Sequence, residues 1–408
     1  MSRIAVIALG ALGALGAWSA SAVAAPAPRE VGLLDALGAV GLAPDHRVAA
    51  SKEREAAAGV DAAGAWPWTS VGVSTMSQTA KLDLGVALPL PLFGTLGANR
   101  AAARSELAIA AAEVRAGDLQ LARDVATAWL ALARTEARAE LTRQSATREA
   151  EVARIAAERF DAGDASRADV VLATAAAKRV AAQADADGAA IAVTSAELAG
   201  RLGWDPQQAL HAAGGVPEAR AELPAVSPHP DVIAAERRAD AQAAAVVETS
   251  RARWPHLVLD LGAAIGDTTL PNTNVPDYRV GVTVEVPLLG HGGASVRAAE
   301  SRLATARLAG AVTSAHLGAE LVAARARFAA AAAHVASLER DVLPAQREAA
   351  ELARAAFHEG QAGIVFVLEA ERALAEAEGE ALDARAEAAT AYVELEWASG
   401  SLAPGSAR

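Results

Sequence analysis

The feature that most constrains this chain is an internal repeat. Motifs of the first half recur about 190 residues later, in the same order. The matched pairs are Pro44-Asp45 with Pro230-Asp231, Trp66-Pro67 with Trp254-Pro255, Gly85-Val86 with Gly281-Val282, Pro91-Leu92 with Pro287-Leu288, and the FDAG run at 160–163 with FHEG at 357–360. Because chance matches would not stay collinear, the chain is predicted to be a tandem duplication of one folding unit.

The duplication predicts how the chain is divided. Residues 26–204 form the first unit, 205–228 a proline-rich and mostly irregular linker, 229–400 the second unit, and 401–408 a short tail. Arg3, an apolar run and Ala22-Val23-Ala24 predict a cleaved secretory signal peptide at 1–25. No later stretch is expected to reach the ~20 apolar residues of a membrane-spanning helix.

Each unit is predicted to hold the same series of elements. A helix begins at a proline, where the missing N–H costs nothing. A strand hairpin follows, about 69–89 in the first unit and 256–287 in the second. A very long helix then runs to Phe160 or Phe357, a glycine turn reverses the chain, and a return helix ends near Trp204 or Trp397. No further strands are expected.

The four strands alternate with a period of two. The apolar sides are Val71 and Val73; Leu82, Leu84, Val86 and Leu88; Leu257, Leu259, Leu261, Ala263 and Ile265; and Tyr278, Val280, Val282, Val284 and Val286. About nine alternating residues fit a tilted strand of a membrane barrel, with the apolar side in lipid and the other side facing a water-filled lumen. The predicted lumen-facing residues are Lys81, Asp83, Asp260, Arg279 and Glu285. A half-buried strand of a soluble sheet alternates identically, but no further strands exist to cover one.

The long segments read as coiled-coil helices. Apolar residues recur every seven positions at Leu107, Val114 and Leu121, and again at Leu321, Phe328, Val335 and Val342. Alanine fills most other inner positions, so neighbouring helices can approach closely. A helix over 97–160 would be about 95 Å long. That length suits a conduit across a periplasm, although an elongated structural coiled coil would look the same. The predicted fold class is therefore mostly α with a small β part.

Composition and motifs give no sign of chemistry. The net charge is −12 and no basic stripe recurs, so no nucleic-acid partner is expected. The chain has no cysteine, and no two of its eight histidines lie within four residues, so no metal site is predicted. Phosphate-loop and dinucleotide fingerprints are absent from the sequence. We expect no cofactor and no enzymatic activity.

Several runs resemble the TolC-like outer-membrane efflux proteins, over nearly all of the chain after residue 25. The runs are LGVALPLPLF at 84–93, VGVTVEVPL at 280–288, ERFDAGDAS at 158–166 and DVVL at 169–172. HPD at 229–231 is most similar to the cation and heavy-metal efflux branch. The resemblance implies a homotrimer with a twelve-stranded barrel on an α-helical tunnel, in the outer membrane of a Gram-negative bacterium. It also implies a periplasmic adaptor and, through it, an inner-membrane pump.

The resemblance also implies a periplasmic gate near the second glycine turn. The family has two acidic residues there, three positions apart, and those positions fall on Phe366 and Glu369. One acid is kept and the other is replaced by an aromatic ring. We therefore expect one carboxylate ring from Glu369 and an apolar constriction from Phe366, with Asp169 of the first unit a weaker candidate. The alternatives are a solvated helix face for Glu369 and a packed core position for Phe366.

The function that these features favour is a passive export duct for small molecules or cations. The alternatives are an outlet for protein secretion, a soluble periplasmic adaptor, and a purely structural coiled coil. An adaptor would need one helical hairpin flanked by many soluble strands, whereas this sequence offers two hairpins and four strands. The substrate and the class of pump are not encoded in any recognisable motif.

Overall fold

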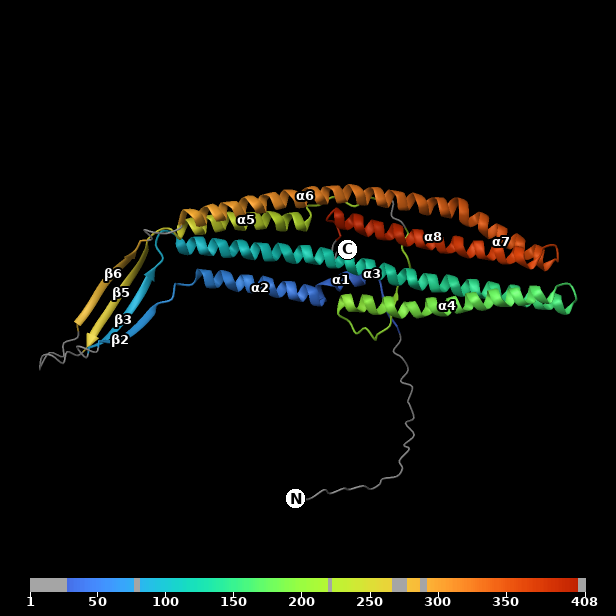
Figure 1. Cartoon of the computed structure of the whole chain (residues 1–408), viewed down its shortest axis with the longest axis horizontal. Coiled ribbons are helices and arrows are strands. Elements are labelled where there is room, and N and C mark those ends of the chain that lie inside the picture. Colours follow the sequence, from blue (N-terminus) through green and yellow to red (C-terminus); the bar gives the residue numbers. More distant parts are fainter. Residues whose placement is uncertain (1–27, 77–80, 219–221, 266–276, 287–291, 403–408) are drawn as a thin grey trace, which may run out of the picture.

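The computed structural model describes residues 28–76, 81–218, 222–265, 277–286 and 292–402. The molecule is elongated: long helices run side by side along its length, and a sheet stands at one end of them (Figure 1). The predicted mostly helical fold with a small β part is confirmed. The signal peptide predicted at 1–25 lies outside the described residues.

The helices of the two repeats follow the same order. The first repeat holds α2 (Pro44–Gly64), α3 (Thr95–Asp161) and α4 (Arg167–Leu202). The second holds α5 (Pro230–Arg251), α6 (Gly292–Ser337), α7 (Leu343–His358) and α8 (Ile364–Ala398). In each repeat a shorter helix lies along the sheet-side half of the long helix, and the return helix lies along the other half (Figure 1).

Local sequence signals set the ends of these helices. Pro44 and Pro230 occupy the first helical positions of α2 and α5, where proline is tolerated. Gly163 and Gly360 adopt positive φ angles of 86° and 79° at the two reversals, as the glycine turns predict. These two reversals form the end of the molecule farthest from the sheet (Figure 1).

The sheet has four antiparallel strands in the order β2-β3-β5-β6. They are β2 (Ser70–Met76), β3 (Lys81–Leu90), β5 (His256–Ile265) and β6 (Asp277–Glu285). The two hairpins therefore join through their inner strands, because β3 of the first repeat pairs with β5 of the second. The two outer strands, β2 and β6, each have one edge without a partner strand among the residues that the structure describes.

Two short strands and a short helix correct the sequence analysis. β1 (Arg29–Val31) pairs in parallel with β4 (Leu210–Ala212), which lies in the linker predicted to be mostly irregular. Helix α1 (Leu33–Gly38) follows β1. Three-residue strands carry too little pattern to be recognised, and tertiary contacts hold them: the Trp129 indole donates a hydrogen bond of 2.7 Å to the Val31 carbonyl. These elements cover the middle of α3 and form the largest core cluster of the described residues.

The long helix of the second repeat was predicted to be continuous, but the structure shows it interrupted. A π-helical segment, Leu338–Val342, separates α6 from α7. Pro344 follows directly, and its ring has no N–H and clashes with the carbonyl four residues earlier, so regular α-helical bonding cannot pass through it. The first repeat has no proline within α3, which runs unbroken for 67 residues.

One helical stretch is long and apolar enough to cross a membrane, although none was expected from the sequence. By length and composition alone, Gly293–His358 is apolar enough to cross a membrane, with a mean hydropathy of 1.2 over its best window. Alanine accounts for this value, since the stretch is alanine-rich throughout. Only 28% of that window is buried within the chain.

The close approach of α4 to α2 generates a stability prediction. Gly203 ends α4 with a positive φ of 68°, and an added Cβ would lie 2.6 Å from the Pro44 ring. Gly203→Ala should therefore lower the free energy of unfolding by about 1–3 kcal/mol through overpacking. Gly188→Ala is the matched control, because nothing lies within 4 Å of that mid-helix glycine. We expect the control to gain about 0.5–1 kcal/mol. Equal melting temperatures for the two variants would contradict the close contact.

Candidate functional site: the strand sheet and the helical tip

The register of the sheet places all apolar alternating residues on one face. Val73 lies opposite Leu84, Leu84 opposite Ala263, and Ala263 opposite Tyr278. A shift of one residue at any pairing would have mixed the two faces. The apolar face is open to solvent in the single chain, with Val71, Val280 and Val282 among its most exposed members. The other face carries the small and charged residues.

A row of glycines crosses the polar face. Gly72, Gly85 and Gly262 lie directly opposite one another on β2, β3 and β5, and Arg279 follows on β6. The Arg279 guanidinium reaches back over Gly262 and forms an ion pair with Asp83. A Cβ on Gly262 would lie 3.7 Å from the guanidinium, which is an ordinary van der Waals contact, so the guanidinium lies close above this backbone. Two predicted lumen-facing residues are thus paired with each other.

The remaining residues predicted to face the lumen form no ion pair with one another among the side chains described. The Asp260 carboxylate accepts a hydrogen bond of 2.5 Å from the Thr283 hydroxyl on the adjacent strand. Glu285 is exposed at the end of β6. Lys81 begins β3, but its side chain lies outside the described residues. The polar face of the sheet therefore carries both signs of charge, with carboxylates in excess among the side chains described.

The predicted gate residues lie in the first two turns of α8, at the tip of the molecule. Gly363 precedes the helix, and Phe366 stands 58% exposed. Glu369 is also exposed, and it forms no ion pair within the described part of the chain. Within the chain Phe366 is not a packed core residue, so its ring is available to something outside the protomer.

Asp169 has a structural partner that the sequence analysis did not assign. It occupies the third position of α4, and its Oδ2 accepts hydrogen bonds of 2.9 Å from the Ser166 N–H and hydroxyl. The Ser166 hydroxyl in turn accepts from the Asp169 N–H, which completes a capping box. These bonds from Ser166 hold the pKa of Asp169 below its ordinary value. Phe366 occupies the corresponding position of α8, where no side chain caps the helix.

Ion pairs join α3 to α8 along their shared length. Arg123 contacts Glu394 at 2.8 Å, and Arg134 contacts Asp383 at 2.9 Å. Arg138 lies against Gly379, whose missing side chain leaves room for the guanidinium. These pairs connect the first repeat to the second.

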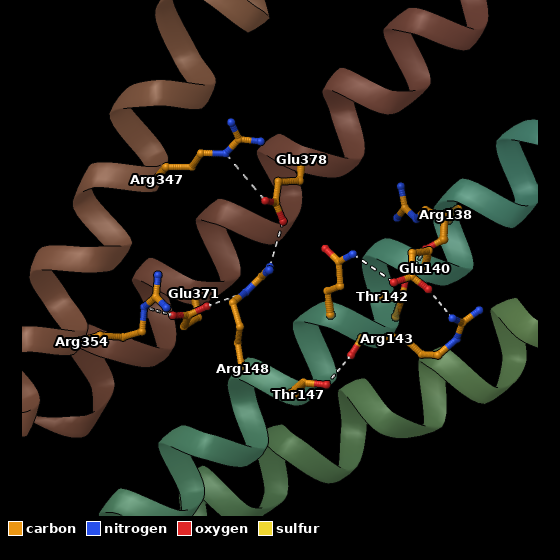
Figure 2. A network of polar contacts seen from close by, with 11 residues as sticks. Arg138, Glu140, Thr142, Arg143, Thr147, Arg148, Arg347, Arg354, Glu371 and Glu378 are labelled. Carbon is orange, nitrogen blue, oxygen red and sulfur yellow. Dashed lines mark hydrogen bonds and ion pairs between the residues drawn. The ribbon is translucent and has the colours of Figure 1, made fainter. Parts of the chain in front are cut away.

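The pairs end near the tip in a partly buried cluster (Figure 2). Arg148 of α3 contacts Glu371 at 3.2 Å and Glu378 at 2.8 Å, both on α8. Glu371 is only 1% exposed. From α7, Arg354 lies 2.9 Å from Glu371 and Arg347 lies 3.9 Å from Glu378. The Arg354 Nε–H donates to the Ala350 carbonyl, so its contact with Glu371 is a charge pair without a hydrogen bond. We name these five residues the Arg148 cluster.

Glu149, the next residue of α3, is buried without such pairing. It is 3% exposed, and its Oε2 has no hydrogen-bond partner within the described residues. Burial and then the charge of Glu371 raise the pKa of Glu149, while Arg179 and Arg148 lower it to a smaller extent. Desolvation is the largest of these effects, and it shifts the equilibrium of this carboxyl toward its neutral form relative to a carboxyl in water.

The sequence analysis missed the Arg148 cluster and Glu149. Their spacing on each helix is ordinary for charged residues on a helix surface. The partners Arg148 and Glu371 are 223 residues apart, so only the packing of two repeats brings them together. The motif counterparts of the two repeats could have indicated which helices pair, but not which side chains meet.

The long packed helices and the four-stranded sheet define the class of fold, and the comparisons with known proteins identify its family. The family model described as outer membrane efflux protein matches residues 39–203 and 225–401. The chain therefore belongs to the outer membrane efflux protein family and is an outer-membrane channel component of efflux systems. Its family consists of channels rather than enzymes. No curated protein matches the chain in sequence.

Solved structures support the same fold. The outer membrane protein VceC from Vibrio cholerae is 21% identical, with a TM-score of 0.76 over 90% of this chain and 96% of that chain. The CmeC outer membrane channel of Campylobacter jejuni is 16% identical, with a TM-score of 0.76 over 92% and 87%. CusC is 18% identical, with a TM-score of 0.73 over 90% and 92%.

Glu149 generates a pH-dependence prediction. The folded protein keeps this carboxyl protonated to a higher pH than the unfolded chain, whose ordinary value is 4.5. The free energy of unfolding should therefore fall as the pH rises from about 4.5 through the raised folded pKa. Glu149→Gln removes that loss of stability. The variant should therefore have the same free energy of unfolding as the wild type in acid and a higher one near neutral pH. Melting temperatures across this range measure the difference.

Glu151→Gln is the matched control on the same helix. The hydrogen bond from Arg154 lowers the pKa of Glu151, so this pKa shift is opposite in sign to that of Glu149. The control variant should therefore gain no stability near neutral pH. If Glu149→Gln kept the wild-type slope of stability against pH, Glu149 would not be the group that titrates.

Proposed function

We propose that this chain works as a homotrimer, as the exit duct that an adaptor connects to an inner-membrane pump. The observation that carries the proposal is the open sheet. Its outer strands β2 and β6 each leave one edge unpaired by any other described strand, and its apolar face is exposed. The apolar face suits lipid, but an unpaired strand edge is not stable in lipid unless the sheet closes. Four strands cannot close, whereas three copies would supply twelve.

The helices support the same assembly. Leu308, Val312 and Val322 of α6 are all about two-thirds exposed, at 69%, 68% and 68%. Leu308 and Val322 lie two heptads apart, so they line one side of the helix. An apolar side of this length needs a partner, and a second copy of the chain supplies one of matching length. The adaptor and the pump follow from the family resemblance.

Two neighbouring residues of β6 test the barrel. Val282 lies on the apolar face and Thr283 on the polar face. Val282→Arg should destabilise the inserted barrel by about 2–4 kcal/mol, because it places a charge in lipid. Thr283→Arg should be tolerated, because its side chain would face water. Carbonate extraction and crosslinking of outer membranes measure insertion and trimer content. A wild-type protein that carbonate washes off would instead indicate a soluble adaptor or a structural coiled coil.

The gate belongs to the same proposal. Phe366 and Glu369 are both exposed, they lie in the first turns of α8, and no other part of the described chain covers them. In a trimer, three copies of this tip would surround the axis, with three rings narrowing the path and three carboxylates attracting cations. Asp169 lies at the same end of the molecule. Its half-buried carboxylate would add charge to that region while its cap holds the start of α4.

Two substitutions separate the gate roles in a planar lipid bilayer. Phe366→Ala should raise the single-channel conductance by widening the constriction. Glu369→Gln should leave the width unchanged but weaken both cation preference and block by multivalent cations. Glu380→Gln, on an exposed position farther along α8, is the control and should behave as the wild type. Wild-type conductance and block in both gate variants would refute the assignment.

A further inference from the structure

The segments that join the sheet to the helices contain no acidic residue. They are residues 62–69, 91–104, 249–256 and 292–299, and Figure 1 shows these joins where the sheet meets the helices. They carry three of the chain's seven tryptophans and the arginines Arg100, Arg104, Arg251, Arg253 and Arg297. The chain as a whole has a net charge of −12, so these joins form a positively charged belt on a protein that is acidic overall.

Two arginines of this belt are not neutralised by carboxylates. Arg251, the last residue of α5, donates a hydrogen bond of 3.4 Å from Nη1 to the Phe93 carbonyl. Arg253 follows in the turn before β5. Both residues are exposed, and neither forms an ion pair within the described part of the chain. A guanidinium has five N–H donors, so most of their donors remain free for a ligand.

An aromatic stack fixes the position of these arginines. The Phe93 ring lies on the Trp254 ring, with centroids 5.4 Å apart and planes 26° from parallel. Phe93 has a positive φ of 65°, which is strained for a residue with a large side chain. The stack and the bond from Arg251 hold that conformation and join the start of α3 to the end of α5. Trp254 is still 47% exposed, so a rigid aromatic surface lies beside the free donors.

The belt lies at the end of the apolar sheet. Strands β2 and β5 begin at Ser70 and His256, directly after the joins that carry Trp68 and Trp254. Trp68 is 95% exposed. At the ends of barrel strands, aromatic rings lie at the level of the lipid headgroups, because the ring is apolar and the indole N–H is polar. With the apolar face of the sheet in lipid, this belt therefore lies among the headgroups of the leaflet nearer the helices.

We propose that Arg251, Arg253 and Trp254 bind the headgroup of an anionic phospholipid in the leaflet nearer the helices. This inference rests on the proposed insertion of the sheet as a barrel. A planar guanidinium fits a phosphate through two parallel hydrogen bonds, and the indole ring packs against the glycerol and the upper part of the acyl chains. A phospholipid with a net negative charge is preferred over a zwitterionic one, because no carboxylate in the belt competes for the arginines.

Lipid binding by the purified full chain tests this site. Native mass spectrometry measures how much phosphatidylglycerol or phosphatidylethanolamine the protein retains as each lipid is titrated into detergent. The wild type should bind phosphatidylglycerol more tightly by at least about tenfold, and the double variant Arg251→Gln/Arg253→Gln should lose that preference. Arg251→Lys/Arg253→Lys keeps both charges and should retain most of the preference. Trp254→Ala should weaken the binding of both lipids alike, because the ring does not respond to the headgroup charge.

The double variant Arg47→Gln/Arg325→Gln is the matched control, since it removes two exposed arginines that lie near the start of α2 and within α6. It should keep the wild-type preference. Equal affinity of the wild type for the two lipids, or an unchanged preference in Arg251→Gln/Arg253→Gln, would overturn the inference. Displacement of the lipid by an equal concentration of inorganic phosphate would also overturn it, because the site would then recognise an anion rather than a lipid. Carbonate extraction and trimer content test the proposed function separately, so its failure is distinguishable from failure of the lipid site.

Discussion

The structure depends on the packing of other helices along α3. Helices α1, α2, α4, α5 and α8 all contact this one 67-residue helix. Alanine is the commonest residue at its buried positions, with leucine and valine where it passes through the central core. Small side chains let the partners approach closely, so one helix can serve several neighbours at once. The second repeat has no equivalent, because α6 ends at the π-helical segment.

The parts of the fold that the sequence predicts are those with a repeated local pattern. In β3 and β6 the period-two alternation continues along the whole strand. The seven-residue spacing near Leu121 and Phe328 continues over several helical turns. β1 and β4 escaped prediction because three residues show no period, and they exist only through contacts such as Trp129 with Val31. The π-helical segment could have been suspected from Pro344, but proline alone does not say how a helix will bend.

In the candidate site too, the features with a repeated local pattern could be predicted from the sequence, and those that depend on tertiary contacts could not. Alternation alone placed Asp83, Asp260, Arg279 and Glu285 on one face, and the register agrees with that grouping. The ion pair between Arg279 and Asp83 could not be predicted from the sequence, because it reaches across the intervening strand β5. The roles of Phe366 and Glu369 came from resemblance, and Asp169 shows that an acid at a helix start can be a cap. Buried carboxylates such as Glu149 leave no trace in sequence, since burial is a property of packing.

The row of glycines has a consequence for the shape of the sheet. Gly72, Gly85 and Gly262 leave three adjacent strands without side chains along one line of a single face. Side chains on the inner face of a curved sheet crowd one another, and their absence relieves that crowding along the line. In the proposed barrel this face is the inner one, so the three glycines would ease the curvature between neighbouring strands along that line.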